Sequence, residues 1–125
     1  MTRLTDNAQL MEYQRAFKEE GDRDALSKMY LLGRDVALRF IEAQAKDNRH
    51  VAELCQSDRQ EKAHNAITYI IERYFRAPGF EIRSSFTAYL FLRVRFELYY
   101  QRKVDKLVRF VDTDKLVHWR EKSGR

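Results

Sequence analysis

Basic and aromatic side chains gather in the second half of this sequence. Residues 73–109 contain nine lysines and arginines against three acidic residues, a net charge of +6, whereas residues 1–72 carry a net charge of −2. Nine of the sixteen aromatic residues lie between Tyr74 and Tyr100, inside the basic segment. A localised cluster of cations favours binding of a polyanion through counterion release. A basic run alone is usually a solvated helix face, but the interleaved aromatic residues favour nucleic-acid binding here.

No set of side chains suited to catalysis or metal binding is apparent. His50, His64 and His118 are scattered, and none has a neighbouring serine or cysteine in a nucleophile motif. The spacing of His50, Cys55 and His64 matches no zinc pattern, and a fourth ligand is lacking. Cys55 is the single cysteine, which rules out an internal disulfide, and there is no glycine-rich phosphate loop. We therefore expect no enzymatic activity, no metal and no cofactor.

Helices are expected to position the basic and aromatic residues. The sequence contains one proline and four glycines, too few for the many turns of an all-β domain of 125 residues. Its hydrophobic fraction of 44% is sufficient for one core. The length suits one domain better than two. We expect residues 1–125 to form a single all-α domain, a helical bundle of about four main helices.

Apolar periodicity and capping residues locate these helices. Counting the caps, they are predicted to begin at Thr5 or Asp6, at Asp22, at Ser57, and at Ser84 or Ser85. They are predicted to end near residues 20, 45 and 76, and at or beyond Lys103. Ser57 and Gln60 have the spacing of a capping box. Residues 46–56 are a polar break with one short turn, and residues 104–125 form a tail.

The last predicted helix is apolar on two sides. One side carries Leu90, Val94 and Leu98, and the other carries Tyr89, Phe96 and Tyr100. A helix of this kind is either enclosed in a core or presents one side to a partner. The pattern leaves both alternatives open.

Three stretches, in order and in spacing, match the pattern of a known family. Residues 20–30 (EGDRDALSKMY) are similar to the opening pattern GDxxAxxxLY. The helix with Ile67, Ile70, Ile71 and Tyr74 lies where that family has its polymerase-binding helix. Residues 85–95 (SFTAYLFLRVR) are similar to SFRAWLYRIAR, which opens the promoter-melting helix. Residues 20–103 thus resemble region 2 of bacterial RNA polymerase sigma factors, particularly the alternative, extracytoplasmic-function kind.

The resemblance implies a transcription-initiation domain with two partners, the RNA polymerase core and single-stranded promoter DNA. It assigns the loop 77–84 to a flipped base, with Phe80 for stacking and Arg83 for phosphate contact. The residues that it implies for DNA binding are Phe80, Arg83, Tyr89, Arg93, Phe96, Tyr100, Arg102 and Lys103. The residues that it implies for polymerase binding are Glu61, Lys62, His64 and Asn65.

Departures from the family pattern favour an alternative. The polymerase-contacting DLVQE pattern falls on residues 61–65, EKAHN, and shares only an acidic residue and a polar pair with it. A counterpart of region 4 is lacking. The alternative is a helical adaptor or decoy that keeps the region 2 shape and binds a protein partner, such as a regulatory protein. In that case Phe80 and the aromatic residues of the last helix pack internally, and the basic side chains are merely solvated.

The N-terminal residues and the hydropathy of the chain bear on its location. Residues 1–6 contain no apolar run of the kind found in a secretory signal. No stretch approaches the roughly 18 apolar residues that a membrane span requires. We expect a cytoplasmic protein without a membrane partner.

Overall fold

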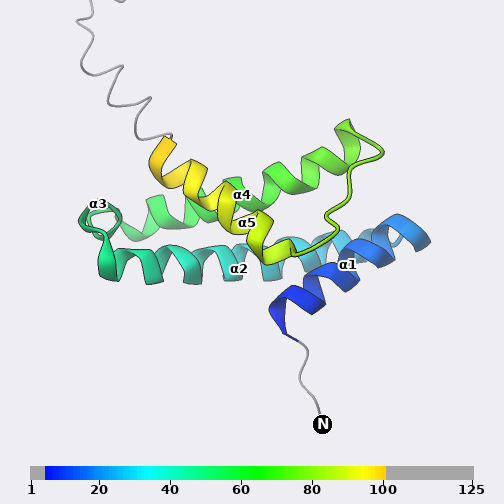
Figure 1. Cartoon of the computed structure of the whole chain (residues 1–125), viewed down its shortest axis with the longest axis horizontal. Coiled ribbons are helices and arrows are strands. Elements are labelled where there is room, and N and C mark those ends of the chain that lie inside the picture. The colour runs from blue at the N-terminus through cyan, green and yellow to red at the C-terminus, as the bar shows by residue number, and fades with distance from the viewer. Residues whose placement is uncertain (1–4, 101–125) are drawn as a thin grey trace, which may run out of the picture.

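Five α-helices and a final π-helical turn make up residues 5–100, the part of the chain that this computed structural model describes (Figure 1). The elements are α1 (Asp6–Glu20), α2 (Arg23–Asp47), α3 (Arg49–Ala52), α4 (Gln56–Arg76), α5 (Phe86–Arg95) and the π-helix η1 (Phe96–Tyr100). Residues 5–100 contain no strand, and the predicted all-α class is confirmed. The predicted DNA-binding residues Arg102 and Lys103 and the tail 104–125 lie outside the described residues.

Three helices have an N-cap residue with a side-chain hydrogen bond at a position that the sequence predicts. The Thr5 hydroxyl accepts a hydrogen bond from the Ala8 N–H at the start of α1. Asp22 caps α2 and Ser85 caps α5 in the same way. These oxygens satisfy N–H groups that have no partner within the helix. Gly21 ends α1 with a φ of 67°, a left-handed conformation that glycine adopts without steric cost.

The predicted capping box at Ser57 is wrong. Helix α4 begins one residue earlier, at Gln56, and its N-cap residue Cys55 makes no side-chain capping hydrogen bond. The α3–α4 junction is held instead by Arg59, whose guanidinium donates to the carbonyl oxygens of Leu54 at 3.1 Å and Ala52 at 3.1 Å. These carbonyls at the end of α3 need donors, and the long arginine side chain reaches them from the first turn of α4.

Helices α2 and α4 run antiparallel side by side and form the centre of the bundle (Figure 1). Their close approach occurs at Gly33, where an added Cβ atom would lie 2.7 Å from Cγ1 of Ile67. Helix α5 packs against both α2 and α4, and α1 packs against α2 and α5. The fully buried large side chains at this centre are Phe86, Leu10, Met29, Ile41, Ile67, Ile70, Leu90, Leu98, Val51 and Val94.

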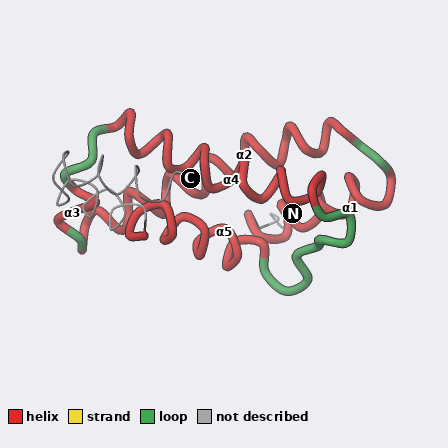
Figure 2. The backbone as a smooth tube through the Cα atoms, turned by 90° about the horizontal axis from the view of Figure 1, so that it is seen from above, coloured by secondary structure: helices red, strands yellow, loops and turns green. Residues whose placement is uncertain are grey.

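Helix α5 turns one of its two apolar sides into this core. Leu90 and Val94 of α5 and Leu98 of η1 are completely buried, in agreement with the sequence pattern. The loop between α4 and α5 bulges from the bundle beside the start of α5 (Figure 2). None of the helices in residues 5–100 is long and apolar enough to cross a membrane.

Candidate nucleic-acid interface

The outward side of α5 and η1 carries a stack of flat side chains, Tyr69, Arg93, Phe96 and Tyr100, which we call the aromatic stack. The guanidinium of Arg93 lies 3.7 Å from the ring centroid of Tyr69 and 4.0 Å from that of Phe96. Phe96 stacks on Tyr100, with ring centroids 4.5 Å apart and planes 16° apart. Tyr69 comes from α4 and the other three from α5 and η1. Cation–π and ring contacts therefore join two helices in one column.

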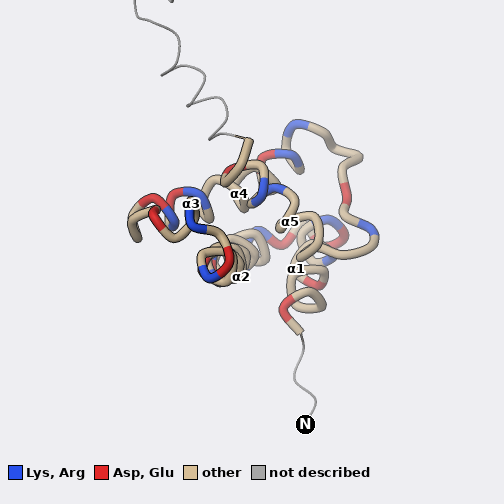
Figure 3. Tube along the Cα trace, turned by 60° about the vertical axis from the view of Figure 1, so that its left-hand side comes forward, with Lys and Arg blue, Asp and Glu red and all other residues tan. Residues whose placement is uncertain are grey.

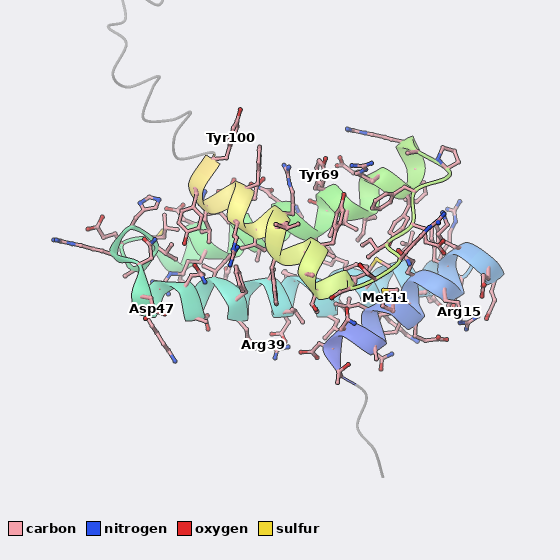
Figure 4. All side chains as sticks on the ribbon, in the orientation of Figure 1. Met11, Arg15, Arg39, Asp47, Tyr69 and Tyr100 are labelled. Atoms are coloured by element: carbon pink, nitrogen blue, oxygen red, sulfur yellow. The ribbon has the colours of Figure 1, made fainter. Side chains whose placement is uncertain are left out.

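The outer end of the aromatic stack is open. Tyr100 is 54% exposed, and it projects from the end of η1 away from the bundle (Figure 4). Leu92 on α5 is 65% exposed. A large aromatic face with water on one side can accept another flat ring, such as a base, at little cost in rearrangement.

The two outer rings of the aromatic stack belong to the π-helical turn η1. Phe96 and Tyr100 are four apart in η1 and stack nearly parallel. Tyr99 anchors this turn, because its hydroxyl donates to Oε1 of Gln44 on α2 at 2.8 Å.

Arg93 is paired with a carboxylate of its own helix. Its Nη2 lies 3.1 Å from Oε2 of Glu97, and Glu97 is 7% exposed. Oε1 of Glu97 accepts a 3.4 Å hydrogen bond from Nδ2 of Asn65 on α4. Arg93, predicted to contact phosphate, is thus engaged within the protein.

The loop between α4 and α5 is anchored to α1 by a buried glutamine. Gln14 is 3% exposed, and its Nε2 donates to the Ile82 carbonyl at 2.8 Å. Its Oε1 accepts from the Ile82 N–H at 2.9 Å and from the Tyr74 hydroxyl at 2.6 Å. Lys18 adds hydrogen bonds to the carbonyls of Pro78 and Phe80. Burial, the main cause, together with the nearby charge of Glu81, raises the pKa of Tyr74 above its usual range.

Phe80, predicted to stack on a base, folds onto the core. Its ring centroid lies 5.2 Å from that of Tyr74 and 5.7 Å from that of Tyr89. The guanidinium of Arg73 covers it at 4.6 Å and donates from Nη1 to the Tyr89 hydroxyl at 3.4 Å. Phe80 and Tyr89 are both half-buried, and they form an internal cluster instead of an open stacking face.

Basic residues flank the loop on its outer side. Arg83 is exposed, and Arg76 is exposed with an ion pair to Glu72. Glu81 lies between these two basic positions in the sequence, and Figure 3 shows an acidic stretch between basic ones along the chain from α4 to α5. Among residues 5–100, Arg83 is therefore the predicted phosphate-contacting residue that the structure leaves accessible to solvent.

The four predicted polymerase-binding residues divide between two sides of α4. Nζ of Lys62 donates to the Glu97 carbonyl at 3.1 Å, and Asn65 also contacts Glu97, so both face η1. Glu61 and His64 face α2 and line a cleft of about 530 Å³. We call it the α2–α4 cleft; its lining residues are Tyr30, Arg34, Asp35, Leu38, Ser57, Gln60, Glu61 and His64.

One hydrogen bond crosses the α2–α4 cleft. The Tyr30 hydroxyl and Nδ1 of His64 are 2.7 Å apart, and their rings meet edge to face. Arg34 lies over the Tyr30 ring at 5.3 Å. Tyr30, the last residue of the first matched stretch, thus contacts the predicted polymerase-binding helix. Among residues 5–100, no three histidine, cysteine, aspartate or glutamate side chains gather as a metal site would require.

Sequence reasoning missed Tyr69, Arg73 and Gln14. Tyr69 and Arg73 both lie on α4 within the basic, aromatic half of the chain, but the pattern assigned that helix to polymerase binding. Their four-residue spacing, which places both on one face of a helix, was an available signal. Gln14 gave no such signal, because a polar residue in an amphipathic helix is normally solvated.

Comparison with known proteins adds no relative. No protein-family model, curated protein or solved structure matches the chain.

Proposed function

We propose that this chain is a sigma-like domain that binds single-stranded nucleic acid along α5 and η1, through the aromatic stack at one end and the loop between α4 and α5 at the other. The observation that carries the proposal is the open outer face of Tyr100, stacked on Phe96. Base–aromatic stacking contributes about 1–3 kcal/mol per base. The exposed Arg83, on the loop before the start of α5, supplies a cation for the phosphate backbone at the other end of this surface.

The α2–α4 cleft is the proposed contact for the polymerase core. Glu61 and His64 line it, and Leu31, 56% exposed on α2, adds apolar surface near it. The cleft and the aromatic stack are formed by different sides of α4. Both partners can therefore bind at once, as transcription initiation requires.

Salt dependence of strand binding tests the nucleic-acid half of the proposal. Fluorescence anisotropy with a labelled single strand should give a dissociation constant in the weak, non-specific range of about 10⁻⁴–10⁻⁶ M. The affinity should fall as the salt concentration rises. Tyr100→Ala should weaken binding by about 1–3 kcal/mol and leave the salt slope unchanged. The matched control is Leu31→Ala, which removes an exposed apolar residue on α2 and should leave strand binding unchanged. Binding that is absent, or indifferent to salt and to Tyr100, contradicts the proposal.

Charge reversal tests the polymerase half. Glu61→Lys should weaken binding to purified bacterial RNA polymerase core, because Glu61 is exposed on the rim of the α2–α4 cleft. Glu19→Lys, on the exposed side of α1, makes the same charge change away from the cleft and should have no effect. Equal effects of the two variants would remove the cleft from the proposal.

A second candidate function is the helical adaptor or decoy. The pairing of Arg93 with Glu97 favours it, because a carboxylate inside the face repels phosphate. The exposed Leu92 and Tyr100 would then meet apolar side chains of a protein. Such an interface would bind with little dependence on salt, unlike a nucleic-acid complex, and the anisotropy experiment distinguishes the two.

A further inference from the structure

The Arg93–Glu97 ion pair differs from the other ion pairs of residues 5–100 in its burial. Its side chains are 21% and 10% exposed, whereas the side chains of the others are at least 43% exposed. Burial of an ion pair requires removal of water from both charges, and the attraction often only balances that cost. A stabilising role alone does not account for the placement of this pair.

The donors of Arg93 are incompletely used. Its Nη2 donates to Glu97, but its Nε–H is buried and has no hydrogen-bond partner. An arginine commonly donates two parallel hydrogen bonds to the two oxygens of a carboxylate or phosphate. Glu97 meets Arg93 through Oε2 alone, while its Oε1 accepts from Asn65. A phosphate group could satisfy both donors of Arg93, which Glu97 does not.

The position of Arg93 makes this incomplete pairing relevant to binding. Its guanidinium lies inside the aromatic stack, directly beneath Phe96 and two layers from the open face of Tyr100. A strand whose base stacks on Tyr100 has the guanidinium of Arg93 as the nearest cation of the column. Arg93 is therefore the cation best placed for phosphate contact within the stack, and Glu97 occupies it.

We propose that Glu97 is an autoinhibitory residue that withholds Arg93 from nucleic-acid phosphate. The inference rests on the proposed strand binding by the aromatic stack. With Glu97 in place, the strand gains the Tyr100 face and the Arg83 charge but no contact with Arg93. Release of the carboxylate frees the Arg93 donors and removes a negative charge that repels the backbone.

The variant Glu97→Gln tests this device directly. Glutamine keeps the size of the side chain but has one acceptor oxygen where Glu97 has two, and it loses the charge. The log–log salt slope for single-stranded DNA should steepen by about 0.7, the value for one added phosphate contact. Affinity at low salt should rise roughly tenfold, at the lower end of the contribution of a charge-assisted hydrogen bond. Thermal melts run in parallel verify that the variant is folded.

Two controls separate the effect of Arg93 from the effect of net charge. Glu53→Gln removes the same charge from another i,i+4 arginine–glutamate pair, with Arg49 on α3, and should leave the slope unchanged. The double variant Arg93→Gln/Glu97→Gln has the net charge of the unmodified chain and replaces the ion pair with two neutral amides. Its slope should equal that of the unmodified chain, because Arg93 makes no phosphate contact there.

The outcomes distinguish failure of the inference from failure of the proposed function. If Glu97→Gln and the unmodified chain bind with the same slope and affinity, strand binding stands and the autoinhibition is wrong. A slope of the double variant about 0.7 shallower than that of the unmodified chain also overturns it, since Arg93 would then contact phosphate already. If neither the unmodified chain nor Glu97→Gln binds a strand, both proposals fail.

Discussion

Gln14 on α1 forms hydrogen bonds with both the backbone N–H and the backbone carbonyl of Ile82, 68 residues further along the chain. One side-chain amide thus satisfies both polar groups of a loop residue as a neighbouring strand would. Ile82 is itself 5% exposed, so its backbone has no water to replace these bonds. The loop that carries Phe80 and Arg83 is consequently attached to the first helix.

Replacement of Gln14 by methionine should destabilise the fold strongly. The Ile82 N–H, the Ile82 carbonyl and the Tyr74 hydroxyl would all lose a partner in a buried site. Each such loss costs about 1–3 kcal/mol. We expect the free energy of unfolding, measured by urea denaturation, to fall by about 3 kcal/mol or more. Gln60→Met, at an exposed position on α4, should change it by less than about 0.5 kcal/mol, and a similar change at both positions would contradict the role of Gln14.

Alkaline pH should selectively remove the stabilisation provided by Tyr74. Burial, foremost, and the nearby charges of Glu81 and Tyr89 raise the pKa of Tyr74 above its usual value of 10.0. Above about pH 10 the unfolded chain loses a proton that the folded chain keeps, so the free energy of unfolding falls by up to about 1.4 kcal/mol per pH unit. Below that pH this contribution is complete.

The variant Tyr74→Phe isolates this effect from the other titrating groups. Urea denaturation at pH 8 should show the unmodified chain about 1 kcal/mol more stable, because the hydrogen bond to Gln14 is present. The difference should shrink as the pH rises from about 10 to 11 and can change sign. A difference that is constant over this range would show that Tyr74 ionises as easily in the folded state as in the unfolded state.

An alanine at position 33 should disturb the contact between α2 and α4. The new Cβ atom would overlap Cδ1 and Cγ1 of Ile67, whose side chain is completely buried and cannot easily move. Overpacking of this kind costs about 1–3 kcal/mol, against roughly 1 kcal/mol gained from the higher helix propensity of alanine.

A second substitution shows whether that overlap is responsible. In the Gly33→Ala background, Ile67→Val removes the Cδ1 atom and should recover part of the lost melting temperature. Ile67→Val alone should cost about 0.5–1.5 kcal/mol. If the losses of unfolding free energy from the two substitutions simply add in the double variant, the overlap with Ile67 is not the cause of the Gly33→Ala effect.

Two tyrosines that sequence reasoning treated alike should respond differently to alanine. Tyr89 packs on Phe80 and accepts a hydrogen bond from Arg73, so Tyr89→Ala should lower the melting temperature clearly. Tyr100 is 54% exposed, and Tyr100→Ala should leave it nearly unchanged. Thermal denaturation followed by circular dichroism measures both. Equal destabilisation would mean that Tyr100 belongs to the core and offers no open face.

Local sequence features were sufficient to predict the helices and most of their starts. Thr5, Asp22 and Ser85 cap helices as predicted, because an N-cap hydrogen bond spans only two or three residues and depends little on the rest of the fold. The capping box at Ser57 failed where a distant donor intervened. Arg59 binds the carbonyls of α3 and sets the junction between the two helices.

The candidate site could be predicted in composition but not in arrangement. The sequence indicates that aromatic and basic residues share the segment 73–100, and that Leu90, Val94 and Leu98 face inward. It does not distinguish Tyr89, which is packed on Phe80, from Tyr100, which is exposed. Tyr89 on α5 is covered by Phe80 of the preceding loop and by Arg73 of α4, whereas Tyr100 lies at the far end of η1.

By itself, then, the sequence determined the all-α class, the inward side of α5 and the meeting of positive charge with aromatic rings in one segment, because each depends on residue type and short-range periodicity. Only the tertiary structure decided which of those groups are free. Lys62 and Asn65 contact Glu97, Arg93 is held between Tyr69 and Phe96, and Gln14 is buried. A side chain's partner depends on which helices lie beside it, and packing between segments far apart in the chain sets that neighbourhood.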